Sequence, residues 1–368
     1  MKPKKRILLI NWRDINNPEA GGAEIYYHEI FKRLATEHDY SVTVLSHLWL
    51  DASATEKIDG TRVIRIGSRL LFNFSVIPWV QKHQQEFDLI IEDLNKAPFF
   101  TPLYTKKPRL HLVMHFFGTA IFKEINFPMA SYIYLMEKMV PVFYKRERFV
   151  AISNSTGREV TQFTGNQDAV DIVEPGIDCE AFYPSQEKAS TPLLVYVGRI
   201  KKYKNIQFII NCLPEIRKDF PSTHLIVAGS GDYQDELKKL THESGLDDAV
   251  EFAGFISETE KRDLLSRATL KINPSVKEGW GITNIEANLC GTISISSNVP
   301  GLCDSVKDGT TGILFRYNDR RDFVGKVKEM LEDSDRRTQM EKTAVSYAKE
   351  FNWDTITQRM NRAIEKVI

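Results

Sequence analysis

Residues 274–286, Pro-Ser-Val-Lys-Glu-Gly-Trp-Gly-Ile-Thr-Asn-Ile-Glu, decide the fold of this chain. The apolar run 269–273 comes before them and stops at a proline, as expected of a short strand. Gly279 and Gly281 predict a tight turn, and apolar residues at helical spacing follow from Ile282 onward. A strand, a glycine turn and a helix in this order point unpaired amides at one place and predict an anion site.

Two glutamates frame this turn. Glu278 stands before it and Glu286 lies one helical turn inside the helix. A carboxylate beside a phosphate site is electrostatically unfavourable, so the pair predicts contact with neutral hydroxyls such as those of a sugar. An ordinary strand-to-helix turn with two solvated glutamates fits the same stretch, and the stretch alone does not separate the two interpretations.

Length and composition bound the class of protein. The 368 residues predict two domains, and 42% hydrophobic with 27% charged residues is typical of a soluble globular chain. Lys+Arg and Asp+Glu both number 49, so the chain has no excess of positive charge that would attract nucleic acid. The four cysteines lie far apart, which favours reduced thiols over disulfides or a zinc site. No apolar run approaches about 18 residues, so we expect a cytoplasmic protein without a membrane span.

Short apolar runs alternate with helical stretches along the whole chain. This pattern predicts βαβ units and two parallel sheets. We expect an N-terminal domain over 1–187, a second domain over 190–350 and a last helix over 351–368 that returns to the first domain. The expected strands are 7–10, 42–45, 63–66, 88–91, 110–114 and 149–152, then 193–197, 225–228, 250–253, 269–273, 292–296 and 312–315.

A basic motif follows the first strand of the second domain. Arg199 leaves the end of that strand, and Lys204 lies five positions on, at the predicted start of a helix. Lysine is unfavourable at a helix N-terminus unless it holds an anion there. The motif therefore predicts diphosphate ligands, with a solvated basic loop as the alternative.

Three further sequence features indicate a function less specifically than the two motifs above. Gly21 and Gly22 lie between a strand and a helix, where their amides would meet a phosphate or simply form a turn. Gly229-Ser230-Gly231 resembles a dehydrogenase loop, but no acidic residue ends the next strand, so we discount that class. His115 ends a strand, where it is placed to bond a sugar hydroxyl.

Together these motifs resemble family 4 of the retaining glycosyltransferases, also called glycosyl transferases group 1. Glu278 to Glu286 match the family's Glu-x7-Glu element, with Trp280 in place of the usual phenylalanine. Gly198-Arg199 with Lys204 match its Gly-Arg-x4-Lys, and Gly21-Gly22 its N-terminal glycine loop. His115 matches its cleft histidine, although Phe116 follows where an acidic residue is common.

The resemblance implies the α/β GT-B fold, in which two Rossmann-like doubly wound parallel-sheet domains face a cleft. It implies retaining transfer from a nucleoside-diphosphate sugar, UDP- or GDP-linked, with no metal and no other cofactor. Arg199 and Lys204 would bind the diphosphate, Glu286 the ribose, and Glu278 and His115 the transferred sugar. Residues expected to line the donor site are Gly21, Gly22, Ile256, Gly279, Trp280, Gly281, Ile282 and Thr283.

Two other functions remain open at this point. A nucleotide-sugar 2-epimerase shares the fold, and a non-catalytic nucleotide-sugar-binding subunit would share the site. The expected acceptor is a saccharide or a lipid-linked hydroxyl of cell-envelope glycan or glycolipid synthesis. An apolar stripe over 129–143 flanked by Lys138, Lys145, Arg146 and Arg148 predicts either a helix packed on the sheet or peripheral contact with the inner face of the membrane.

Overall fold

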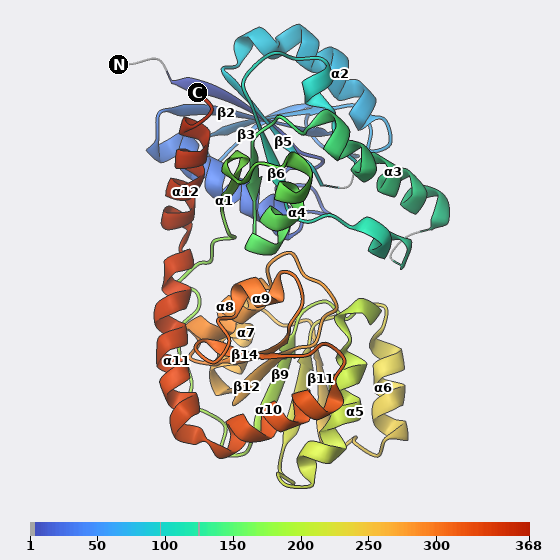
Figure 1. Ribbon diagram of the computed structural model, residues 1–368, viewed down its shortest axis with the longest axis vertical. Helices are drawn as coiled ribbons and strands as arrows, with labels where there is room; N and C mark the ends of the chain where they lie inside the picture. Colours follow the sequence, from blue (N-terminus) through green and yellow to red (C-terminus); the bar gives the residue numbers. More distant parts are fainter. Residues whose placement is uncertain (1–3, 96, 124–125) are drawn as a thin grey trace. The chain divides into compact units, whose positions relative to one another are not determined.

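The computed structural model describes residues 4–95, 97–123 and 126–368 and divides into two compact units (Figure 1). Unit 1 is Met1–Gly176 with Trp353–Ile368, and unit 2 is Ile177–Asn352. The expected boundary at 187–190 lies further along the chain than this division. The C-terminal segment from Trp353 belongs to unit 1.

The sheet of unit 1 has eight strands in the order β3-β4-β2-β1-β5-β6-β7-β8. Neighbouring strands are parallel except β3 and β4, which form an antiparallel edge. The strands are β1 Lys5–Ile10, β2 Tyr40–His47, β3 Thr55–Ile58, β4 Thr61–Ile66, β5 Leu89–Asp93, β6 Arg109–Val113, β7 Phe149–Ala151 and β8 Val170–Ile172. The central strands are buried apolar runs, as parallel strands covered on both faces require.

The helices of unit 1 connect successive strands, and the last helix of the chain packs among them. They are α1 Gly22–Glu37, α2 Phe72–His83, α3 Phe127–Phe143, α4 Asn154–Thr164 and α12 Trp353–Glu365, with the 3-10 segments η1 Gln84–Glu86, η2 Thr101–Leu103, η3 Gly118–Lys123 and η4 Gln167–Ala169. Helix α12 packs against α1, where Asp354 Oδ1 accepts a hydrogen bond from Arg33 Nε at 3.2 Å. Its buried stripe of Ile356, Met360 and Ile364 explains why it docks there.

Unit 2 contains a six-stranded parallel sheet in the order β11-β10-β9-β12-β13-β14. The strands are β9 Leu193–Val197, β10 His224–Ala228, β11 Val250–Gly254, β12 Leu270–Asn273, β13 Ser294–Ser297 and β14 Gly312–Phe315. The helices are α5 Ile206–Arg217, α6 Gln234–Glu243, α7 Glu258–Arg267, α8 Ile282–Leu289, α9 Leu302–Ser305, α10 Arg320–Glu332 and α11 Ser334–Ala348, with η5 Lys202–Lys204 and η6 Lys349–Phe351. The two parallel α/β sheets confirm the predicted fold class.

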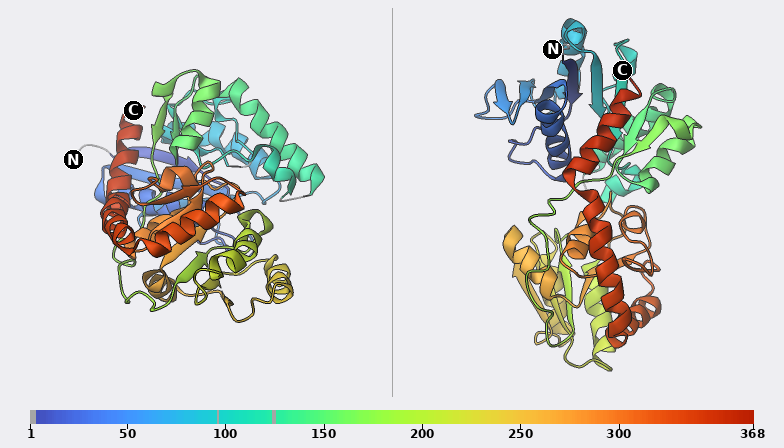
Figure 2. Two further views of the ribbon diagram at one scale, coloured as in Figure 1. Left: turned by 60° about the horizontal axis from the view of Figure 1, so that its bottom comes forward. Right: turned by 90° about the vertical axis from the view of Figure 1, so that its left-hand side faces the viewer.

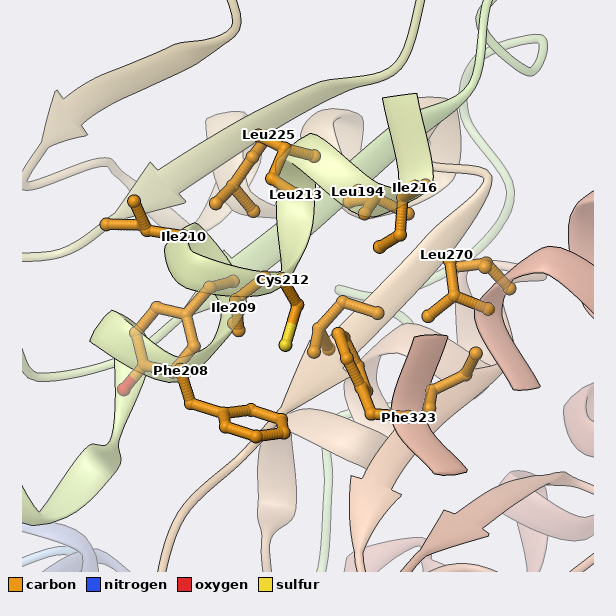
Figure 3. Packing of buried hydrophobic residues seen from close by; sticks show 14 of the residues in the cluster. Leu194, Phe208, Ile209, Ile210, Cys212, Leu213, Ile216, Leu225, Leu270 and Phe323 are labelled. Atoms are coloured by element: carbon orange, nitrogen blue, oxygen red, sulfur yellow. The ribbon is translucent and has the colours of Figure 1, made fainter. Parts of the chain in front are cut away.

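The core of unit 2 lies between its sheet and the helices on one face. Side chains of α5, α10 and the strands interlock there, with Phe208 and Phe323 at ring centroids 5.3 Å apart (Figure 3). Helix α8 packs on β12 and β13, and α7 packs on α8 and β9. Right-handed crossovers put α7 and α8 on the face opposite α5. Figure 2 gives two further views of the ribbon, in which helices flank the strands of unit 2.

Each sheet reverses its strand order at one point. In unit 2 the chain moves outward from β9 to β11 and then restarts at β12, on the other side of β9. In unit 1 the same reversal lies between β1 and β5. Loops at the carboxyl ends of the strands beside such a switch point diverge and leave a crevice where ligands bind. The loops after β9 and β12 are therefore the expected ligand-binding loops of unit 2.

Candidate functional site

The turn after β12 is shaped to open the N-terminus of α8. Gly281 has φ +83°, and a Cβ there would lie 2.7 Å from Leu302 Cδ2, so both backbone and space require glycine. As the N-cap residue of α8 it offers no side chain to the first-turn amides. The amides of Ile282 and Thr283 thus begin a helix whose positive end has no capping oxygen from the N-cap.

The loop after β9 lies against this turn. Tyr196 Oη donates to the carbonyl of Arg199 at 3.0 Å, and the guanidinium of Arg199 donates to Tyr203 Oη at 3.3 Å. The amide of Val276 donates to the carbonyl of Tyr203 at 3.1 Å, which ties the β12 loop to the β9 loop. Two motifs about 80 residues apart in sequence therefore converge at the switch point, as parallel strand ends must.

Lys204 and Glu278 are direct partners in this place. The ammonium of Lys204 donates to Glu278 Oε1, and both side chains are largely buried. The amide of Glu278 donates to the carbonyl of Pro300 at 3.3 Å, which fixes the residue's backbone. The predicted diphosphate cation, Lys204, and the predicted sugar carboxylate, Glu278, thus neutralise each other.

Glu286 forms an ion pair with Lys261, a contact that the sequence did not predict. Lys261 of α7 donates to Glu286 Oε1 at 2.9 Å, and its ammonium lies 4.7 Å from the centre of the Phe182 ring. The other oxygen, Glu286 Oε2, is buried and has no hydrogen-bond partner in the described part of the chain. A buried acceptor without a partner loses its hydration without compensation, so this oxygen has the capacity to accept a hydrogen bond from a ligand.

Trp280 and Ile256, both predicted to line the donor site, lie in the loops after β12 and β11. The indole of Trp280 is buried, with its ring centroid 5.4 Å from that of Phe351. Ile256 is half buried in the loop after β11, next to the exposed Phe255. The glycines at 229 and 231 have a packing role, because a Cβ on Gly229 would lie 1.9 Å from the carbonyl oxygen of Gly198.

The sequence-predicted residues of unit 1 lie in the segments that follow β1 and β6. Gly21 caps α1, but its amide donates to Glu24 Oε2 at 2.7 Å, so a carboxylate already occupies that amide. The His115 ring lies after β6 with its centroid 4.5 Å from that of Phe117. The buried Glu137 of α3 accepts from the amides of Phe117 and Gly118, both at 2.8 Å, and so fixes the loop that begins at the histidine.

Two family models together match most of the chain. The model described as Glycosyltransferase Family 4 matches residues 20–181, and the model described as Glycosyl transferases group 1 matches residues 180–347. The chain belongs to glycosyltransferase family 4. The resemblance predicted from the Glu-x7-Glu and Gly-Arg-x4-Lys motifs is confirmed.

Curated relatives of this family 4 chain are moderately similar. It is 27% identical over 209 residues to a D-inositol 3-phosphate glycosyltransferase of Paenarthrobacter aurescens, covering 53% of this chain. It is 29% identical over 216 residues to a glycogen synthase of Mycobacterium tuberculosis, covering 57% of this chain. The chain spans about half the length of these curated relatives, 51% and 52%.

Solved structures of the same fold match over nearly the full length. Sucrose-phosphate synthase from Thermosynechococcus elongatus has a TM-score of 0.77 at 21% identity, covering 99% of both chains. Anabaena HepE in complex with UDP-glucose has a TM-score of 0.73 at 17% identity, covering 98% of this chain and 99% of that one. WaaG, a glycosyltransferase involved in lipopolysaccharide biosynthesis, has a TM-score of 0.70 at 17% identity, covering 97% and 98%. At these identities the matches establish the fold, and the GT-B prediction is confirmed.

Proposed function

We propose that this family 4 chain is a retaining glycosyltransferase that moves a sugar from a nucleoside-diphosphate sugar to a hydroxyl acceptor. The observation that carries the proposal is the arrangement around α8 in unit 2. An uncapped N-terminus of α8, the cations of the β9 loop and an unpartnered carboxylate oxygen of Glu286 in α8 all belong to the elements that follow β9 and β12, the strands of the switch point. Amides and cations suit a diphosphate, and a free carboxylate oxygen suits a ribose hydroxyl.

The roles follow from charge. Arg199 and Lys204 bind the diphosphate and stabilise the negative charge that develops on the leaving phosphate, while the first-turn amides of α8 assist. Glu286 accepts hydrogen bonds from the ribose. Glu278, released from Lys204, and His115 bond hydroxyls of the transferred sugar. The leaving phosphate assists attack by the acceptor on the same face of the sugar, so the anomeric configuration is retained.

The donor is proposed to be UDP- or GDP-linked. HepE was solved with UDP-glucose, which makes this donor the first to test. The relatives include D-inositol 3-phosphate glycosyltransferases, and WaaG acts in lipopolysaccharide biosynthesis, so a hydroxyl acceptor in envelope glycan or glycolipid synthesis is the class we favour. The protein would work in the cytoplasm or on the inner face of the membrane.

The test is a donor screen followed by turnover. A ligand at 100 times its Kd adds about 2.7 kcal/mol of stability, so thermal shift identifies the donor among nucleotide sugars. Release of nucleoside diphosphate from that donor supports the transferase, and the matched variant Lys204→Met should lose release. Binding without release for any acceptor offered would favour the non-catalytic subunit. Interconversion of C2 epimers would favour the epimerase.

A further inference from the structure

A third lysine lies beneath the candidate donor site. Lys271, on β12, is fully buried, and its ammonium makes one hydrogen bond, to Asn284 Oδ1 at 2.5 Å. Within residues 4–95, 97–123 and 126–368 it forms no ion pair with a carboxylate. Burying a charged group without a partner is costly, so a lysine kept in this position calls for a counterion or for loss of its proton.

The carboxylates nearby are already neutralised. Glu278 is paired with Lys204 and Glu286 with Lys261, which leaves the charge of Lys271 in excess. Burial lowers the pKa of Lys271, Glu278 and Glu286 raise it, and Lys204 lowers it, with a net result of about 7. Burial thus holds the pKa of Lys271 well below the ordinary value of 10.5.

Asn284 connects this lysine to the first turn of α8. Its Nδ2 donates to Ser305 Oγ at 2.9 Å, so its carbonyl oxygen must face Lys271. That oxygen also accepts from Ser296 Oγ at 3.3 Å. The backbone amide of Asn284 donates to the carbonyl of Gly281 at 2.8 Å, which closes the turn. Polar groups from α8, α9 and β13 thus fix the lysine behind the helix N-terminus.

The position is unfavourable for a cation until an anion arrives. The N-terminal end of a helix carries partial positive charge, so it repels the ammonium and attracts a phosphate. A dianion in front of the first turn would supply the counterion that Lys271 lacks. By reciprocity, protonation of Lys271 and binding of the dianion strengthen each other.

We propose that Lys271 is a positioning residue that holds the first turn of α8 through Asn284, and that its amine takes up one proton from solvent when a nucleoside-diphosphate sugar binds in front of that turn. The step converts –NH2 to –NH3⁺, and the proton comes from the buffer. The second half rests on the proposed function, whereas the first half does not.

The ligand-linked half is tested by calorimetry. UDP-glucose and GDP-mannose are titrated at pH 7.5 in buffers that differ in ionisation enthalpy, because their pyrophosphate diesters do not titrate there. Wild type should take up roughly half a proton or more per ligand bound. Lys271→Met should take up none, and the exposed Lys201→Met should behave like wild type. Uptake that persists in Lys271→Met, no uptake in wild type, or binding of neither ligand overturns this half.

Asn284→Asp keeps the test usable if Lys271→Met does not fold. A carboxylate at this position holds the ammonium charged in both states, so proton uptake should vanish while Lys271 remains. Uptake equal to that of wild type in this variant would also overturn the linkage.

A stability measurement without ligand tests the titration of Lys271 independently of the proposed function. The pKa of about 7 lies below the ordinary 10.5, so the unfolded chain binds more protons between these values. Wild type should therefore gain stability relative to Asn284→Asp, whose lysine stays charged, as the pH rises from 7 to 10. If the stability of wild type and of Asn284→Asp changed in parallel with pH, the pKa of Lys271 would not be lowered in the folded protein. The predicted curves together with failure of both nucleotide sugars to bind would leave the titration of Lys271 standing, and would overturn the proposed donor and with it the ligand-linked half.

Discussion

Lys204 and Glu278 form an ion pair that joins the loop after β9 to the loop after β12. Both side chains are largely buried, so the pair is screened less than one on the surface. A diphosphate that binds Lys204 must compete with this carboxylate. Donor binding would then release Glu278 at the moment when the transferred sugar can use it.

The first prediction concerns the two cations of the β9 loop. Arg199→Ala and Lys204→Met should each lower kcat by about 10²- to 10³-fold, because each removes a positive charge from the developing phosphate. Lys201→Met is the matched control, since Lys201 follows the same strand but pairs with Asp232 at 2.7 Å. Steady-state kinetics decide the matter, and either variant within threefold of wild type would refute the diphosphate assignment.

The two glutamates should differ in what they bind. Glu286→Ala should weaken binding of free UDP about 10- to 100-fold, because Glu286 Oε2 is the oxygen without a partner and charged hydrogen bonds are worth about 1.5–3 kcal/mol. Glu278→Ala should leave UDP affinity unchanged or improve it, because Lys204 is freed for the phosphate. Calorimetry with the bare nucleotide measures both, and equal losses would contradict this division of roles.

The positions of the motifs were predictable because strand ends carry strong local signals. Buried apolar runs such as Leu193–Val197 and the glycines after β9 and β12 mark the ends of these strands in the sequence, whereas the strand order that makes the two strands neighbours is known only from the structure. The short strands β3 and β8 were not predicted. Each has three or four partly polar residues, and only pairing with a neighbouring strand makes them strands.

The lysines around α8 could not be assigned from sequence. Lys261 stands in a helix crowded with charges, where nothing distinguishes the residue that faces Glu286. Lys271 alternates with apolar neighbours as if it pointed to solvent, and it is buried because α8 covers that face of β12. Both facts depend on packing between elements that are distant in sequence.

A buried network in unit 1 should give a pH-dependent stability. His111 Nε2 lies 3.2 Å from Glu147 Oε2, and its Nδ1 lies 3.4 Å from Glu92 Oε2. Burial lowers the pKa of His111, but hydrogen bonds and attraction from the two carboxylates outweigh it and raise the pKa above 6.5. A raised pKa stabilises the fold fully below pH 6.5 and less as the pH rises through the folded value.

The matched comparison is His111→Gln. Wild type should exceed this variant most in free energy of unfolding at pH 6, by about 1–3 kcal/mol, and the difference should shrink toward pH 9. Urea unfolding across this range measures it. A constant difference would show that the pKa of His111 is the same in the folded and the unfolded chain.

Activity should not depend on a divalent metal. In the proposed mechanism, the cations of the β9 loop and the amides of α8 neutralise the diphosphate, which is the task of a metal ion in other enzymes. In the described ranges, no group of three or more His, Cys, Asp or Glu is arranged to hold a metal ion. Because the proposed roles of Arg199 and Lys204 already supply positive charge to the diphosphate, turnover should continue in excess EDTA. Abolition by EDTA with rescue by Mn²⁺ would overturn the metal-free mechanism.

The last prediction concerns the outward face of α3. The helix buries Ala130, Ile133, Glu137 and Val140, so one side does pack on unit 1 as an amphipathic helix should. The opposite side is apolar and exposed, with Phe127 at 74%, Leu135 at 57% and Val142 at 71%. No helix in the described part of the chain is long and apolar enough to cross a membrane. A surface contact with lipid is the arrangement that this face suits.

Charge supports an anionic surface as the partner of that face. Lys138, Lys145 and Arg146 are exposed beside it, whereas Glu137 is buried against the loop amides and Arg148 is paired with Asp171. Wild type should co-sediment with anionic vesicles at low salt and less at high salt. Lys145→Glu/Arg146→Glu should weaken binding about 30-fold or more, since each basic residue contributes about 1 kcal/mol.

Leu135→Ser/Val142→Ser should weaken binding at both salt concentrations, because it removes the apolar part of the contact. Lys238→Glu/Lys239→Glu, which makes the same change in charge on the exposed side of α6, is the control and should bind like wild type. If wild type stayed in the supernatant at low salt, or if both charge-reversal variants lost binding equally, α3 would not be the lipid contact. A soluble acceptor would then be expected.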